Sequence, residues 1–143
     1  MNKVIFFILL MLVSRSGFPD GLYLDGGYDF IPGSSDFALG YQEGNVAFEM
    51  SALFRGKEEP VTKPGPQISL NALSFISSLP IFVKAGVVTG TGKSGYNLGA
   101  GFDYAINERW GIRNQLTYYR VTEDAGQGAE SEHLFSVALK YQF

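Results

Sequence analysis

The carboxyl-terminal stretch 132–143 alternates between two kinds of side chain. Every second residue from Phe135 to Phe143 is large and apolar, whereas the positions between them are mostly small or polar and include Lys140 and Gln142. A repeat of two residues is typical of a β-strand whose two faces meet different environments. The chain is therefore predicted to end in a strand with one apolar face.

The same alternation recurs in residues 96–104 and 110–120. The apolar faces of these strands hold large side chains and no charge, while the other faces hold glycine, amides and single charges of both signs. A narrow membrane barrel needs a small, polar, charge-paired interior and an apolar exterior. A soluble lipocalin-like binder would reverse the pattern, and it stays open as an alternative.

Eight strands follow from this pattern, separated by stretches rich in glycine, proline or charge. The predicted strands are 21–30, 37–42, 46–55, 67–77, 81–89, 96–104, 110–120 and 132–143. In the fourth, the alternation fades near Leu73 and Phe75. The predicted turns and loops are 31–35, 43–45, 56–66, 78–80, 90–95, 107–109 and 122–131.

The stretches after the odd-numbered strands are mostly longer than the others, as expected of external loops opposite short periplasmic turns. Aromatic residues then fall at both rims of the barrel, which is typical of membrane interfaces. The fold class is predicted to be all-β, an eight-stranded antiparallel up-and-down transmembrane β-barrel. The predicted periplasmic girdle is Tyr41, Tyr104, Trp110, Tyr141 and Phe143, and the outer girdle is Phe30, Phe37, Phe54, Tyr96, Tyr118 and Phe135.

The amino-terminal stretch has the layout of a secretory signal. Lys3 precedes an apolar run over residues 4–13, which is too short to span a bilayer as a helix. We predict a cleavable signal peptide over residues 1–16, cut after Ser16, and a barrel domain over residues 17–143. Export is consistent with this fold, because an outer-membrane barrel must first cross the inner membrane.

Composition narrows the partners and the chemistry. The formal net charge of −3 argues against a nucleic-acid partner, which would need a basic stripe. The chain has no cysteine, so disulfides and cysteine-based metal sites are excluded. No cofactor and no metal are expected.

Residues 96–120 and the terminal Tyr141-Gln142-Phe143 resemble the small OmpA-like and OmpX-like outer-membrane barrels. The first segment is a strand, a short turn and a second strand with inward Asp103 and Arg113, and the resemblance extends over residues 21–143. It implies the outer membrane of a Gram-negative envelope, with lipid bilayer and lipopolysaccharide as surroundings. It also implies that the insertion machinery recognises Tyr141 and Phe143.

Charged residues on the predicted inner face are balanced in sign. Because a buried charge must be paired, an ion-paired plug is predicted. A narrow or gated ion pathway is the functional alternative. The predicted lumen charges are the acids Asp25, Asp29, Glu49 and Asp103 and the bases Arg55, Lys84, Arg113 and Lys140.

The loops carry the remaining functional potential, because function on rigid scaffolds concentrates there. A structural or surface-interaction role, in membrane integrity or adhesion, is predicted, with a possible surface ligand at residues 56–66 and 122–132. Four basic residues lie where lipopolysaccharide phosphates are expected. They are Lys57, Lys63, Lys93 and Arg120.

His133 is the only histidine, and Ser131 lies on the same strand face. Outer-membrane lipid A deacylases are similar in placing serine and histidine on a lipid-facing strand. The order here is reversed, and no oriented base or oxyanion site is visible. The chain is predicted not to be an enzyme, with a lipid-modifying activity as the alternative.

Overall fold

The computed structural model describes residues 20–31, 34–55, 66–76, 79–90, 92–124, 126 and 128–143, without the side chains of Ile31 and Arg55. The predicted signal peptide lies outside these ranges. Within them, no helix is long and apolar enough to cross a membrane.

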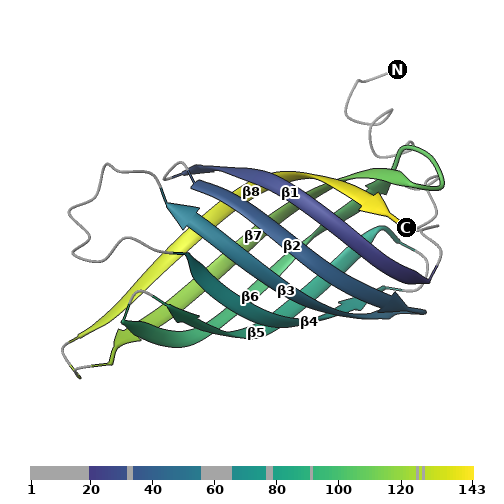
Figure 1. Ribbon diagram of the computed structural model, residues 1–143. Helices are drawn as coiled ribbons and strands as arrows, with labels where there is room; N and C mark the ends of the chain where they lie inside the picture. The colour runs from purple at the N-terminus through teal and green to yellow at the C-terminus, as the bar shows by residue number, and fades with distance from the viewer. Residues whose placement is uncertain are drawn as a thin grey trace, which may run out of the picture.

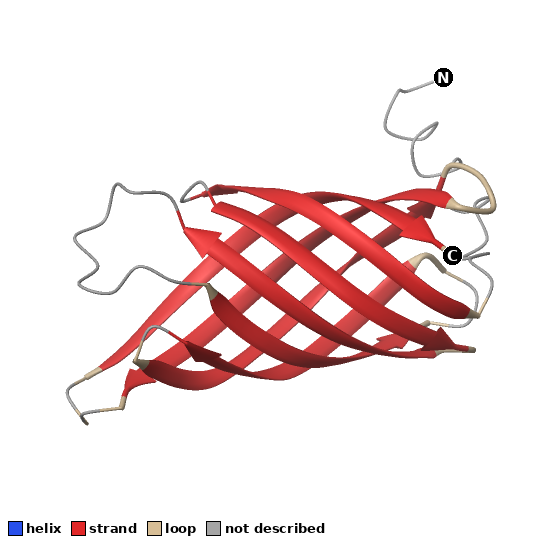
Figure 2. Cartoon of the chain, in the orientation of Figure 1, coloured by secondary structure: helices blue, strands red, loops and turns tan. Residues whose placement is uncertain are grey.

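Eight strands form one closed barrel in which each strand is antiparallel to its chain neighbour and β8 closes on β1. Figures 1 and 2 show the strands tilted steeply around the barrel. The predicted up-and-down topology is confirmed. The strands are β1 (Gly21–Ile31), β2 (Ser34–Glu43), β3 (Val46–Arg55), β4 (Gln67–Phe75), β5 (Ile81–Gly90), β6 (Lys93–Ala105), β7 (Trp110–Glu123) and β8 (Ala129–Gln142).

The predicted inward and outward faces are also those of the structure. In β8, Ser136, Lys140 and Gln142 are buried inside the barrel, while Phe135 and Leu139 are half exposed on its outside. β4 keeps the alternation to its end, with Leu73 and Phe75 turned inward. The pattern faded there because these inward residues are as apolar as the outward ones.

Three predicted connections are wrong, because the strand ladders continue through them. Ser34 and Ser35 pair with β1, so β2 begins within the turn predicted at 31–35. Gly90 pairs with Lys93, which reduces the loop predicted at 90–95 to residues 91–92. Gly90 and Gly92 have φ of 131° and 73°, a backbone that favours glycine and permits so tight a turn.

The third correction extends a hairpin. β7 and β8 pair as far as Thr122 with Ala129, so the loop predicted at 122–131 covers only residues 124–128. The connections after the odd-numbered strands are consequently not all longer than those after the even-numbered strands. Residues 56–66 form the longest joint. We call the end with Gly21, Gln142 and the turns at 44–45, 76–80 and 106–109 the turn end, and the opposite end the loop end.

The outside of the barrel is covered with large apolar side chains that no part of the described chain buries. Phe48 and Val87 are 66% and 61% exposed, on different strands. A soluble protein rarely exposes such a continuous apolar surface, so this surface belongs in lipid. The lipocalin-like alternative is contradicted, because it requires the apolar residues inside.

Candidate functional site

The lumen is layered along the barrel axis. An apolar cluster lies near the turn end and a second near the loop end, with polar and charged side chains elsewhere. The turn-end cluster is Tyr23, Ala47, Leu73, Phe75 and Phe82, and the loop-end cluster is Leu53, Val88, Tyr119, Val121 and Leu134.

Arg113 on β7 is the centre of the charged layer. Its guanidinium donates from Nε and Nη2 to the two oxygens of Asp103, at 2.6 and 3.0 Å. Nη1 donates to Asp25 Oδ2 at 2.8 Å and to Glu49 Oε2 at 2.5 Å. One side chain therefore binds carboxylates from three other strands, β1, β3 and β6.

Aromatic rings enclose the same guanidinium. The Arg113 Cζ atom lies 5.2 Å from the ring centre of Tyr23 and 5.0 Å from that of Phe82. A weakly hydrated, planar guanidinium suits such stacking as well as forked binding of carboxylates. The rings exclude water from the ion pairs, so each charged group depends on its partner for stabilisation.

Lys140 on β8 provides the second positive charge. Its Nζ donates to Asp103 Oδ2 at 2.8 Å and to Gln42 Oε1 at 3.4 Å, and lies 4.1 Å from the Tyr23 ring centre. The Tyr23 hydroxyl donates to Glu49 Oε2 at 2.9 Å. Two cations and three carboxylates thus form one connected network, which we call the Arg113 network.

Glycine makes room for this network. Gly40 lies opposite Tyr23 in the ladder of β1 and β2, and a Cβ at Gly40 would overlap the Tyr23 ring. Only a residue without a side chain lets the ring lie flat across the neighbouring strand. The inward glycines therefore set how large the other lumen side chains can be.

A second polar group lies further along the lumen. Lys84 Nζ donates to Gln115 Oε1 at 3.0 Å, without a carboxylate within ion-pair distance among the described side chains. Asn97 Nδ2 donates to Asn71 Oδ1 at 2.8 Å, and Asn71 donates to Ser51 Oγ at 3.1 Å. This layer is held by amide and hydroxyl hydrogen bonds.

The structure brings together five of the eight predicted lumen charges. Asp25, Glu49, Asp103, Arg113 and Lys140 form the Arg113 network.

The other three predicted charges lie elsewhere. Lys84 is in the amide layer, and Asp29 accepts a hydrogen bond from Ser34 at 2.9 Å. Arg55 ends β3, but its side chain lies outside the described part of the chain.

Sequence reasoning missed one lumen charge, Asp36, and the contacts of one lumen ring, Tyr23. Asp36 is buried with its Oδ1 lacking a hydrogen-bond partner, and the prediction omits it because the predicted second strand begins at residue 37, three residues after the start of β2. Its parity with Ala38 and Gly40 was the available signal. Tyr23 alternates with Leu22 and Leu24, which indicates the inner face, yet its role as the ring under both cations depends on contacts that one strand cannot reveal.

The predicted surface residues are dispersed. His133 points outward, with its ring 5.1 Å from that of Tyr118, and Ser131 is exposed on the same face. Lys93 Nζ binds Glu130 Oε2 at 2.6 Å, while Arg120 is exposed. No group of three metal-ligating side chains occurs in the described ranges.

The two residues of the predicted insertion signal lie together at the turn end. The rings of Tyr141 and Phe143 are 5.1 Å apart and perpendicular, and the Phe143 amide donates to Leu22 O at 3.0 Å. Phe143 is 70% exposed. Its ring is therefore available at the surface although its backbone is bound to β1.

A closed eight-stranded barrel with an apolar exterior and a polar, charged interior is the architecture of small outer-membrane proteins. The chain is accordingly an outer-membrane β-barrel. Its sequence matches no family model and no curated protein.

Two solved structures are similar. The crystal structure of Neisserial surface protein A aligns over 85% of this chain and 96% of the Neisserial chain, with a TM-score of 0.53 and 14% sequence identity. The outer membrane protein AlkL, studied by solid-state NMR in lipid bilayers, aligns over 90% of both chains, with a TM-score of 0.42 and 11% identity. The first likeness extends to the fold, and confirms the predicted fold class.

Proposed function

We propose that this protein is a sealed outer-membrane barrel of the OmpA-like and OmpX-like kind, with a structural and surface-interaction role at its loop end. One observation carries the proposal. The register of β1 with β8 ends at Ile31 and Phe135, whereas β8 continues to Ala129. Within the described residues, positions 129–134 of β8 pair with β7 alone.

Over these positions β8 therefore extends past its described pairing with β1. In Figure 1 the β7–β8 hairpin extends beyond the neighbouring strand ends. A strand that extends past its neighbour offers an edge that an extended segment of another protein can join as a further strand. The hairpin has more acids than bases even after Lys93 has paired with Glu130, so a basic segment is the complementary partner; its acids are Glu123, Asp124, Glu130 and Glu132.

The lumen contents support a sealed barrel. Apolar clusters lie near both ends, and the Arg113 network joins five strands through the lumen. An eight-stranded barrel is narrow enough to be filled by its own side chains. Planar-bilayer recording is expected to detect no stable large conductance, and such a conductance would contradict the seal.

Lipopolysaccharide is the proposed surrounding at the loop end. Arg120 is exposed on the outer face and suits a phosphate contact, whereas Lys93 is engaged by Glu130. Lys57 and Lys63 lie outside the described residues. Replacing Arg120 with Gln is expected to weaken lipopolysaccharide-dependent folding more than replacing Lys93 with Gln does.

The edge is tested by shortening the hairpin. Arg120 and Ser131 are paired partners, so replacing residues 121–130 with Asn-Gly joins them by a two-residue turn. Cells with the native barrel are expected to bind immobilised, reduced and alkylated lysozyme, an unfolded basic chain, and cells with the short hairpin to lose this binding. A variant with residues 57–65 replaced by a Gly-Ser linker is the control. Equal binding by the short-hairpin and native cells would contradict the proposal.

A further inference from the structure

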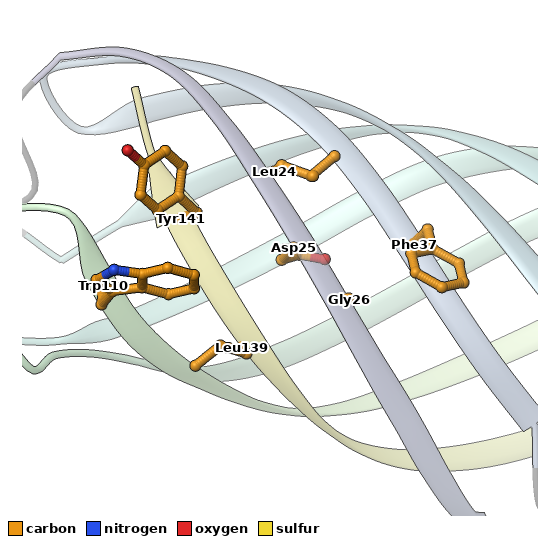
Figure 3. Close-up of a pocket in the computed structure, with 7 residues that line it drawn as sticks. All are labelled: Leu24, Asp25, Gly26, Phe37, Trp110, Leu139 and Tyr141. Atoms are coloured by element: carbon orange, nitrogen blue, oxygen red, sulfur yellow. The ribbon is translucent and has the colours of Figure 1, made fainter.

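A shallow apolar recess lies on the outer wall near the turn end. Figure 3 shows Trp110 and Tyr141 at one side of it and Phe37 at the other, with Gly26 between them. Leu24 and Leu139 complete the apolar lining, and the backbone of Asp25 contributes to the floor. The recess spans strands β7, β8, β1 and β2.

The absence of a side chain at Gly26 creates the recess. Leu139, Gly26 and Phe37 are neighbours in one row across three strands, and all face outward. The flanking residues are large, so the apolar wall is interrupted at Gly26. The Phe37 ring packs beside Gly26, where a Cβ would lie 3.2 Å from it, so a larger side chain would press on that ring and intrude into the recess.

One side of the recess carries polar groups and the guanidinium of Arg109. The rings of Trp110 and Tyr141 are 4.8 Å apart in an edge-to-face arrangement. Arg109, in the adjoining exposed turn, donates from Nη1 to the Tyr141 hydroxyl oxygen at 3.4 Å. Aromatic rings of this kind lie at the headgroup level of a bilayer, and an arginine there attracts anionic lipid.

A second recess on the opposite wall provides an internal comparison. It is lined by Phe48, Met50 and Val87 around the small residues Ala72 and Ala85. Neither tryptophan nor arginine is among its lining residues. It offers apolar contact without a headgroup partner.

We propose that the recess over Gly26 is a binding site for one anionic glycerophospholipid of the leaflet at the turn end. One acyl chain lies in the recess between Leu139 and Phe37, and the phosphate binds Arg109 beside Trp110 and Tyr141. The site lies at the other end of the barrel from the proposed surface edge, and it depends only on the position of the barrel in a bilayer. Its failure would leave the loop-end function untouched.

The single tryptophan of the chain, Trp110, lines the recess and reports on its occupancy. The refolded barrel is reconstituted in dibrominated phosphatidylcholine, which quenches tryptophan, and part of this lipid is replaced by unbrominated phosphatidylglycerol. If phosphatidylglycerol binds preferentially at the recess, the Trp110 fluorescence recovers by a larger fraction than the fraction of phosphatidylglycerol in the bilayer. One basic residue at a membrane surface corresponds to about a fivefold preference for the anionic lipid.

The variants separate the two halves of the site. Gly26→Leu, which fills the recess, and Arg109→Gln, which removes the phosphate partner, are each expected to abolish the preference. Ala85→Leu fills the second recess and is expected to keep it. Arg109 is exposed in a turn, so the Arg109→Gln variant remains informative even if the Gly26→Leu barrel does not fold. Equal affinity for both lipids in the native barrel, or an unchanged preference in Arg109→Gln, would overturn the proposal.

Discussion

Arg113 lies directly opposite Asp103 in the ladder of β6 and β7, and its Nε and Nη2 atoms bind the two carboxylate oxygens at 2.6 and 3.0 Å. Both side chains are 1% exposed. The pair is local, but the remaining guanidinium nitrogen reaches carboxylates on β1 and β3. This relationship joins neighbouring strands to distant ones through the lumen.

Removing the guanidinium is expected to destabilise the barrel strongly. Arg113→Met leaves three buried carboxylates without their common partner, and loss of one member of a buried ion pair costs about 3–5 kcal/mol. Urea unfolding in lipid vesicles measures the change. Lys93→Met is the control, because the Glu130 side chain of its ion pair is 64% exposed and a surface pair is worth about 0–1 kcal/mol. Equal effects of the two substitutions would mean that the buried carboxylates do not depend on Arg113.

Gly40 is expected to resist substitution because of the ring that covers it. Gly40→Val forces Tyr23 away from Glu49 and the cations, and such overpacking costs about 1–3 kcal/mol. The same substitution in a Tyr23→Ala background is expected to cost less, which a double-mutant cycle measured by urea unfolding would reveal. Additive effects would show that the ring does not restrict this position.

Phe143 is expected to matter for assembly more than for stability. Its ring is exposed, while its amide bond to Leu22 does not depend on the side chain. Phe143→Ala should therefore refold in detergent like the native chain, yet reach the outer membrane of cells in reduced amounts. Heat-modifiable gel migration measures both quantities. Normal assembly in cells would argue against recognition of this ring by the insertion machinery.

We expect that the protein does not modify lipid A and that His133 therefore has no catalytic role. Its ring contacts Tyr118, and Ser131 lies two residues away on an exposed strand. Mass spectrometry of lipid A from cells with and without the protein should give the same acyl pattern, and His133→Ala should give it too. Loss of an acyl chain that requires both His133 and Ser131 would establish the enzymatic alternative.

The local sequence pattern was sufficient to predict which face of a strand each side chain lies on. The faces of β6, β7 and β8 follow from the two-residue period of the extended chain. Strand ends were less predictable, because Lys93–Gly95 and Ala129–Ser131 are polar segments whose strand structure comes from pairing with a neighbour. Polar composition marks a loop only where no partner strand is available.

By itself, the sequence determined the all-β class, the strand order, and which side chains face lipid or lumen. The physical reason is that alternation is a property of a single extended strand and needs no distant contact. Only the tertiary structure decided how β8 meets β1, and with it which charges meet. Asp25 and Arg113 are 88 residues apart, and the closed barrel brings them within 2.8 Å. The recess over Gly26 arises likewise from four strands in register, because no single strand contains it.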